Sequence, residues 1–174
     1  MAKLPQHPDP YGILLLHASA VQTKKGALIF LGPSGTGKST VCLRLHPYVS
    51  PLADDKIHLV PQNGHWLVSD ATKRNFQRAL FSFEAKALKG VPLRAVFRLY
   101  QDSKSSVERL MPHQTCFHLA NSFFDLFWQQ NWEVSYKKSV FTNLGNIARV
   151  IPGYSIRFNL STDIRNLIAT VDLL

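Results

Sequence analysis

The 174-residue chain has few cysteines, few acidic residues and no long apolar run. Its two cysteines, Cys42 and Cys116, exclude a disulfide framework of the kind that holds small secreted domains together. No stretch approaches the roughly 20 apolar residues that a transmembrane helix needs, so we expect no membrane-spanning segment. The apolar run at residues 13–16 is also too short for a secretory signal, and we predict a cytoplasmic protein.

Acidic residues are scarce relative to basic ones, because 11 Asp and Glu stand against 20 Lys and Arg and the formal net charge is +9 at pH 7. This excess favours acidic ligands, either phosphate-bearing molecules or a nucleic acid. Aromatic residues in the last third, such as Phe124 and Trp128, invite a base-stacking interpretation, but their helical spacing favours a core or a subunit interface. We therefore do not expect nucleic acid to be a partner.

Short apolar runs that alternate with turn signals predict a β-rich first two thirds. The expected strands span residues 13–16, 19–22, 27–31, 56–60, 65–68, 93–100 and 154–158. The expected helices span residues 38–46, a segment that begins at Pro112, part of 132–150, and a closing segment capped by Ser161. Residues 71–90 are ambiguous and are interpreted mostly as loop. Without a repeat or a linker, this pattern predicts one α/β domain over residues 1–174, helical in its C-terminal part.

One segment carries a strong chemical signature. The sequence Gly32-Pro33-Ser34-Gly35-Thr36-Gly37-Lys38-Ser39 fits G-x-x-x-x-G-K-[ST] at every position, between an expected strand and an expected helix. In this phosphate-binding P-loop (Walker A), glycines let consecutive N–H groups point at phosphate oxygens, and the helix start adds partial positive charge. We expect ATP to bind along Gly32 to Thr40, with Lys38 neutralising the β- and γ-phosphates and Ser39 ligating Mg²⁺.

Two adjacent carboxylates, Asp54 and Asp55, follow the expected helix. Their mutual repulsion has to be offset by a cation or a proton. A solvated turn is the alternative for an isolated pair, but beside a complete phosphate loop we favour a division of roles. One carboxylate then faces the metal, and the other faces a hydroxyl group that is to be deprotonated.

The segment Leu16-His17-Ala18-Ser19-Ala20-Val21, the loop, and Leu52-Ala53-Asp54-Asp55 together resemble the catalytic domain of the HPr kinase/phosphorylase family and its short serine-kinase-like relatives. The ATP-dependent phosphoenolpyruvate carboxykinases, with a similar loop, are more distant. The resemblance implies a P-loop domain of the HPr kinase/carboxykinase type, with a histidine, here His17, in the strand before the loop. It implies that Asp55 is the catalytic base, which leaves Asp54 to support the metal. It also implies that Glu84 is a further Mg²⁺ ligand and that the protein forms homo-oligomers. A surface acid paired to a lysine is the alternative for Glu84.

The sequence leaves two interpretations open for several side chains. His17 either donates to a phosphate oxygen or orients Asp55, or it is a core histidine. Arg94 and Arg98 either neutralise transferred charge and bind an acidic acceptor, or they are the exposed face of a strand. The group of His113, Cys116 and His118 looks like a zinc site, but His118 faces elsewhere on a helix and no fourth ligand appears, so we expect no zinc there.

These observations together predict a kinase that uses ATP and Mg²⁺ to transfer the γ-phosphate to a hydroxyl-bearing acceptor, such as a serine of a protein, a peptide or a free amino acid. The alternative is an ATP-binding sensor or scaffold subunit without catalysis. The bifunctional enzymes of the family carry an N-terminal domain that has no match here. The resemblance therefore implies neither phosphorylase activity nor HPr as the acceptor.

Overall fold

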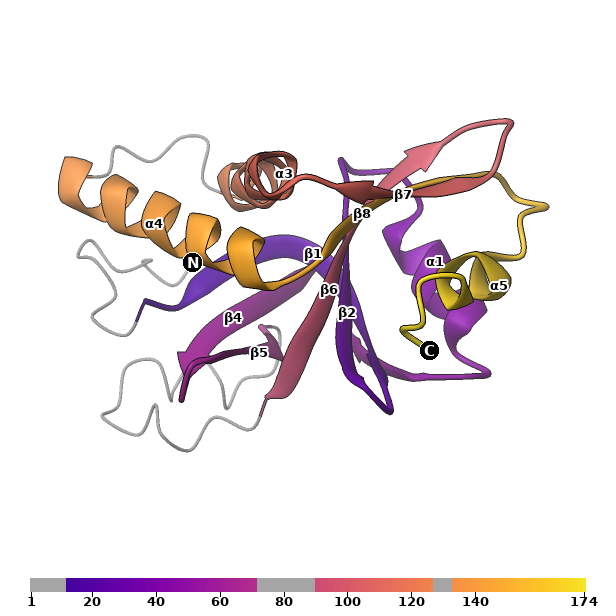
Figure 1. The fold of residues 1–174 in the computed structure, drawn as a ribbon, viewed down its shortest axis with the longest axis horizontal. Coiled ribbons are helices and arrows are strands. Elements are labelled where there is room, and N and C mark those ends of the chain that lie inside the picture. The colour runs from indigo at the N-terminus through magenta and orange to yellow at the C-terminus, as the bar shows by residue number, and fades with distance from the viewer. Residues whose placement is uncertain (1–11, 72–89, 127–132) are drawn as a thin grey trace.

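The computed structural model describes residues 12–71, 90–126 and 133–174. The strands are β1 (Leu14–Thr23), β2 (Gly26–Leu31), β3 (Ser50–Ala53), β4 (Lys56–Gln62), β5 (His65–Asp70), β6 (Val91–Gln101), β7 (Ser106–Leu110) and β8 (Gly153–Phe158). The helices are α1 (Lys38–Leu45), α3 (Pro112–Phe124), α4 (Val134–Val150) and α5 (Ile164–Ala169). The expected mixed α/β architecture is confirmed, with a β-rich first part and a mainly helical last part (Figure 1).

The strands of the described residues form one mixed sheet of eight strands. β1 pairs antiparallel with β4 through its first half, and with β2 and β3 through its second half. β6 runs parallel to β2 and β8, while its first residues pair with β5, so the path β2–β1–β4–β5–β6 returns to β2. In the register of β1, Ala18 lies opposite Leu31 at the end of β2, and Ala20 lies opposite Ala53 at the end of β3. The segments that follow β2 and β3 therefore emerge beside the same stretch of β1.

Helices cover both faces of this sheet, with α3 and α4 on one side and α1 and α5 on the other (Figure 1). Because side chains alternate along a strand, β2 contributes side chains to two hydrophobic cores, one on each face of the sheet. Ile29 and Leu31 pack in the core that α3 and α4 complete, whereas Leu28 and Phe30 pack in the core that α1 and α5 complete. Every residue of β2 is consequently buried, which explains its continuous apolar sequence.

Some sequence expectations about individual elements are wrong. Residues 14–23 form one strand rather than two, because β1 changes partners along its length instead of ending. The cap of α5 is not Ser161, whose hydroxyl donates to Asn159, but Asp163, whose side chain accepts from the N–H of Asn166. The ambiguous stretch lies outside the described residues over 72–89, and so does Glu84. Among the described residues, no helix combines the length and apolar character needed to cross a membrane.

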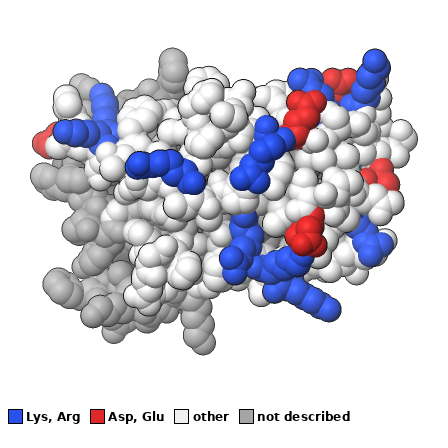
Figure 2. Space-filling model, viewed as in Figure 1, with Lys and Arg blue, Asp and Glu red and all other residues white. Residues whose placement is uncertain are grey.

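Basic side chains do not gather in one stripe on the face that Figure 2 shows. They lie in several separate groups, and acidic side chains lie against some of them. Lys25 pairs with Asp172 at 2.7 Å, and Arg157 pairs with Asp102 at 3.0 Å. Exposed pairs of this kind add little stability, but they divide and partly neutralise the positive surface.

Candidate functional site

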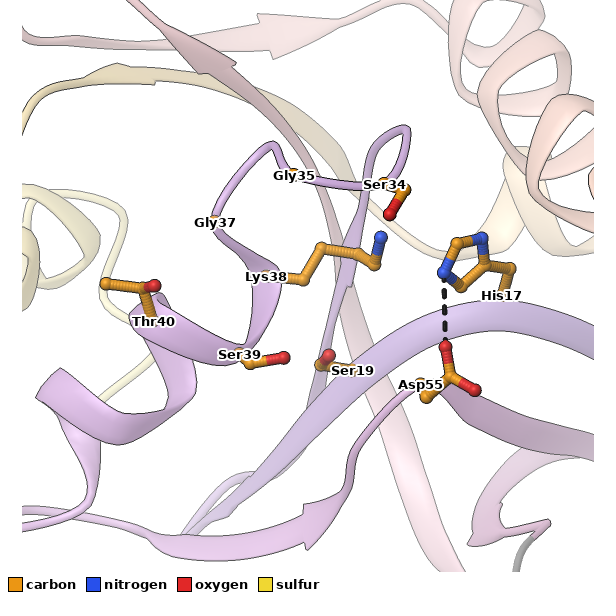
Figure 3. Close-up of a pocket in the computed structure, with 9 residues that line it drawn as sticks. All are labelled: His17, Ser19, Ser34, Gly35, Gly37, Lys38, Ser39, Thr40 and Asp55. Carbon is orange, nitrogen blue, oxygen red and sulfur yellow. Dashed lines mark ion pairs between the residues drawn. The ribbon is translucent and has the colours of Figure 1, made fainter.

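The glycine-rich loop between β2 and α1 borders a cavity of about 270 Å³. Gly35 and Gly37 have φ angles of +81° and +94°, in the left-handed region that favours glycine. A Cβ atom on Gly35 would meet nothing within 4 Å, and Gly37 is the N-cap residue of α1. The loop therefore brings the start of α1, with its unpaired N–H groups, to the cavity, which is an arrangement suited to an anion. The cavity is lined by His17, Ser19, Ser34, Gly35, Gly37, Lys38, Ser39, Thr40 and Asp55 (Figure 3).

Lys38 is the buried cation of this cavity. Its side chain extends from the start of α1 toward Ser34 and His17 (Figure 3), and Nζ donates to the carbonyl oxygens of Gly32 at 2.8 Å and Pro33 at 3.2 Å. Burial lowers the pKa of Lys38, and nearby carboxylates oppose part of this effect. Because an anion is a stronger acceptor for an ammonium group than a carbonyl is, a phosphate in the cavity would compete for Lys38.

One carboxylate oxygen atom of Asp54 accepts three hydrogen bonds. Its Oδ1 accepts from Ser19 Oγ at 2.6 Å, from Ser39 Oγ at 2.8 Å and from the N–H of Asp55 at 3.1 Å. Burial alone would raise the pKa of Asp54, but these hydrogen bonds, together with the charge of Lys38, hold it below its ordinary value. Asp54 is therefore a fixed carboxylate that links β1, the start of α1 and the turn after β3.

Asp55 points away from those hydroxyl groups and toward His17 (Figure 3). Its Oδ1 lies 3.3 Å from His17 Nε2, and 62% of its side-chain surface is exposed. The backbone of Asp55 is left-handed, with φ of 73°, and its carbonyl accepts from the N–H of Ala18 at 3.1 Å. Burial, followed by the charge of Lys38, lowers the pKa of His17, so that the neutral imidazole predominates at pH 7.

The residues that the sequence singled out do not all meet. Gly32 and Pro33 line a neighbouring cavity instead, and the Thr36 hydroxyl donates to Pro33 O at 2.7 Å, which closes the turn of the loop. Arg94 donates to the carbonyl of Lys25 at the β1–β2 hairpin and does not join the site. Glu84 lies outside the described residues, so the structure does not place it.

Three contacts at the candidate site were not predicted from the sequence. Ser19 holds Asp54, as described above, and the Ser122 hydroxyl donates to the carbonyl of His17 at 2.9 Å. Asp125, which follows α3, lies with Oδ2 at 3.8 Å from His17 Nδ1. The α3 residues could have been found from the sequence, because His118, Ser122 and Asp125 recur at spacings of four and three residues, which places them on one side of a helix.

Two oxygen donors of the kind that a magnesium ion binds lie next to each other at the site. Mg²⁺ prefers oxygen ligands and is held by one or two carboxylates together with substrate phosphates and water. The Ser39 hydroxyl and the Asp54 carboxylate meet at the edge of the cavity, beside the start of α1. In residues 12–71, 90–126 and 133–174, no group of three or more His, Cys, Asp or Glu residues could hold a metal. The Ser39 hydroxyl and the Asp54 carboxylate fit a metal ion that is shared with substrate phosphates.

A family model described as SynChlorMet cassette protein ScmC matches residues 3–171. The chain belongs to the ScmC family. No curated protein matches the chain. Among solved structures, the Hpr(Ser) kinase/phosphatase from Coxiella burnetii is similar at a TM-score of 0.48 and 13% identity, over 91% of this chain and 87% of that one. A likeness this distant carries no chemistry over to this member of the ScmC family.

Proposed function

We propose that this ScmC-family protein is a kinase that uses ATP and Mg²⁺ to phosphorylate a hydroxyl group, such as a serine of a protein, a peptide or a free amino acid. One observation carries the proposal, namely that the two adjacent carboxylates have separate partners beside one cavity. Asp54 accepts hydrogen bonds from Ser39 and Ser19, whereas Asp55 faces His17 and solvent. Phosphoryl transfer needs this separation, because one acid supports the metal and the other serves the attacking hydroxyl.

The loop and α1 would hold the nucleotide. Backbone N–H groups near Gly35 and Gly37 would contact phosphate oxygens, and Lys38 would exchange its carbonyl partners for them. Ser39 and Asp54 would hold Mg²⁺, which supplies charge neutralisation at the phosphates when it is bound. Because Asp54 is already fixed by hydrogen bonds, little reorganisation is required when the ligands arrive.

Asp55 would act as the general base. As the acceptor hydroxyl oxygen bonds to the γ-phosphorus, the bond from that phosphorus to the ADP oxygen breaks, and the hydroxyl proton passes to Asp55. The exposed Asp55 carboxylate is accessible to an acceptor from solvent. His17, a neutral imidazole between Asp55 and Asp125, would orient Asp55 through its Nε2.

The test is transfer of labelled γ-phosphate from Mg-ATP in an extract of the source organism, with label sorted into protein, small molecules and free phosphate. Wild type is compared with Asp55→Asn and Lys38→Ala. Asparagine tolerates the left-handed backbone of residue 55, so Asp55→Asn removes the base with little strain. We expect transfer to fall about 10²- to 10⁴-fold in Asp55→Asn while Mg-ATP binding, measured by calorimetry, persists.

The matched control is Asp102→Asn, which neutralises a half-buried aspartate that pairs with Arg157 away from the cavity. It should transfer phosphate as wild type does. If wild type binds Mg-ATP but labels nothing above the two site variants, the kinase proposal fails and a nucleotide-binding sensor or scaffold subunit takes its place.

A further inference from the structure

A second cavity, of about 150 Å³, adjoins the first along the loop. It is lined by Leu31, Gly32, Pro33, Arg98, His118, Asn121, Ser122 and Asp125. Two contacts connect the cavities, because Lys38 in the first bonds the Gly32 and Pro33 carbonyls, and His17 in the first lies against Asp125 in the second. The proposed function assigns no role to this space.

Arg98 supplies a positive charge from β6. Its guanidinium lies over the ring of Tyr100, 4.7 Å from the centroid. Its Nε is buried and has no hydrogen-bond partner among the residues that the structure describes. A buried N–H group without a partner is unfavourable, and in a native protein it calls for an explanation, such as a functional role or a bound water or ion. The side chain also lies close against the loop, since a Cβ atom on Gly32 would stand 2.9 Å from Nη1.

The opposite wall of the second cavity is a polar stripe on α3. His118, Asn121, Ser122 and Asp125 share one side of this helix, at spacings of three and four residues. Burial, and then the charge of Arg98, lowers the pKa of His118, so at pH 7 it offers hydrogen bonds without adding charge. Asp125 follows the C-terminal end of α3, where the helix dipole disfavours an acid, so helix stability does not explain its place. The charge of Arg98 is thus at the loop side, and that of Asp125 is beside His17.

We propose that the second cavity binds a carboxylate of the phosphate acceptor, with Arg98 as its charge partner and Asn121 and His118 as hydrogen-bonding neighbours. The planar guanidinium matches a carboxylate in two parallel hydrogen bonds, and the cavity holds a group the size of one residue. An acceptor whose carboxylate is bound there would extend beside His17, with its hydroxyl group toward Asp55. The role as an acceptor site rests on the proposed function, whereas carboxylate binding at Arg98 does not.

The experiment follows the Arg98 Nε–H signal by nuclear magnetic resonance in the intact chain, with the signal assigned by its loss in Arg98→Lys. Acetate is the probe, and acetamide is its neutral isostere. We expect acetate to shift the Arg98 signal and the Asn121 side-chain amide, and acetamide to shift neither. Binding of acetate should weaken about tenfold or more in Arg98→Lys, because lysine lacks the paired donors. Arg94→Lys, which changes an exposed arginine on the same strand, should bind acetate as wild type does.

Equal shifts with acetate and acetamide, or unchanged acetate binding in Arg98→Lys, would overturn the proposal. A parallel titration with Mg-ADP, followed at the amides of Gly35 and Gly37, separates the two proposals. Mg-ADP binding without an acetate shift at Arg98 would support the kinase proposal and overturn the carboxylate site. An acetate shift at Arg98 without Mg-ADP binding would support the carboxylate site and overturn the kinase proposal. If acetate binds, a blocked peptide with an aspartate beside serine and a peptide with a free carboxyl-terminal serine identify the source of the carboxylate.

Discussion

At the residue scale, the Oδ1 atom of Asp54 is the point where three segments of the chain meet. Ser39 is the expected metal ligand, and Ser19 holds the carboxylate from β1 without being a ligand itself. Ser19→Ala should therefore weaken Mg²⁺ binding about 10- to 100-fold, the usual effect of losing a residue that orients a ligand. Ser39→Ala should weaken it further. Calorimetric titration of Mg²⁺ into the protein with ADP measures both effects.

The control for this comparison is Ser135→Ala, which removes a hydroxyl that bonds to Glu133 at the start of α4. Its Mg²⁺ affinity should equal that of wild type. An unchanged Mg²⁺ affinity in Ser19→Ala, beside a clear loss in Ser39→Ala, would contradict the orienting role of Ser19.

Local sequence signals found only part of the site. Lys38 and Ser39 were predictable because their geometry depends on the consecutive residues of one loop, and Asp54 and Asp55 because adjacent acids need partners. Ser19 was not singled out, because its role depends on β3 pairing beside that stretch of β1. Arg98 was left between two interpretations, since a strand pattern does not show that α3 and the loop enclose a cavity around it.

At the element scale, the loop depends on backbone conformations that alanine disfavours. Gly35→Ala and Gly37→Ala should each destabilise the protein by about 1–2 kcal/mol, because both residues are left-handed. Gly37→Ala should cost more of the two, since its Cβ atom would lie 3.2 Å from the Phe158 ring, whereas that of Gly35 meets nothing. Urea denaturation at pH 7 measures these free energies of unfolding.

A glycine in a helix is the control, because its replacement by alanine should change stability in the opposite direction. Gly145 lies within α4, its φ is not positive, and a Cβ atom there would meet nothing within 4 Å. Gly145→Ala should therefore stabilise the protein by about 0.5–1 kcal/mol through the lower entropy of the unfolded chain. If all three alanine variants lose stability equally, backbone conformation does not explain the loop glycines.

Local sequence signals predict some helices and strands of this fold and miss others. The α1 helix and the β4–β5 hairpin were predictable from local signals, an apolar face ending before Pro47 and a Gly64-containing turn. β3 has a weak strand sequence, yet it forms because it pairs with β1. β7 was not expected, and its hydrogen bonds come from β8, which lies far along the chain. The strands that the sequence predicted poorly are therefore those whose stability comes from distant partners.

At the scale of the whole molecule, β1 determines where the candidate site lies. It pairs with β2 before the loop and with β3 before Asp54, and it also carries His17 and Ser19. β6 joins β2 to β8 and carries Arg98. The loop thus stands between two cavities, one beside the paired aspartates and one beside α3. In the proposed kinase, the nucleotide and its acceptor would accordingly approach from different sides of the loop.

Stability of the whole molecule should fall in mild acid because of a buried histidine. Burial lowers the pKa of His58 in β4 to about 4, with a partly opposing effect of Asp70. Its pKa in the unfolded chain is the ordinary value of 6.5. Above pH 6.5 His58 is neutral in both the folded and the unfolded chain, so its contribution to the free energy of unfolding is complete there. Between pH 6.5 and 4 only the unfolded state binds it, so the free energy of unfolding falls as pH falls.

From pH 7 to pH 5 this effect amounts to about 2 kcal/mol, because each pKa unit corresponds to about 1.4 kcal/mol. Urea denaturation of wild type and His58→Gln at both pH values measures it. The variant should lose about 2 kcal/mol less than wild type on acidification, whatever the change costs at pH 7. His17 and His118, whose pKa values are also lowered, remain in both proteins and so cancel in the difference. Equal losses in the two proteins would mean that His58 is protonated as readily in the folded chain as in the unfolded one.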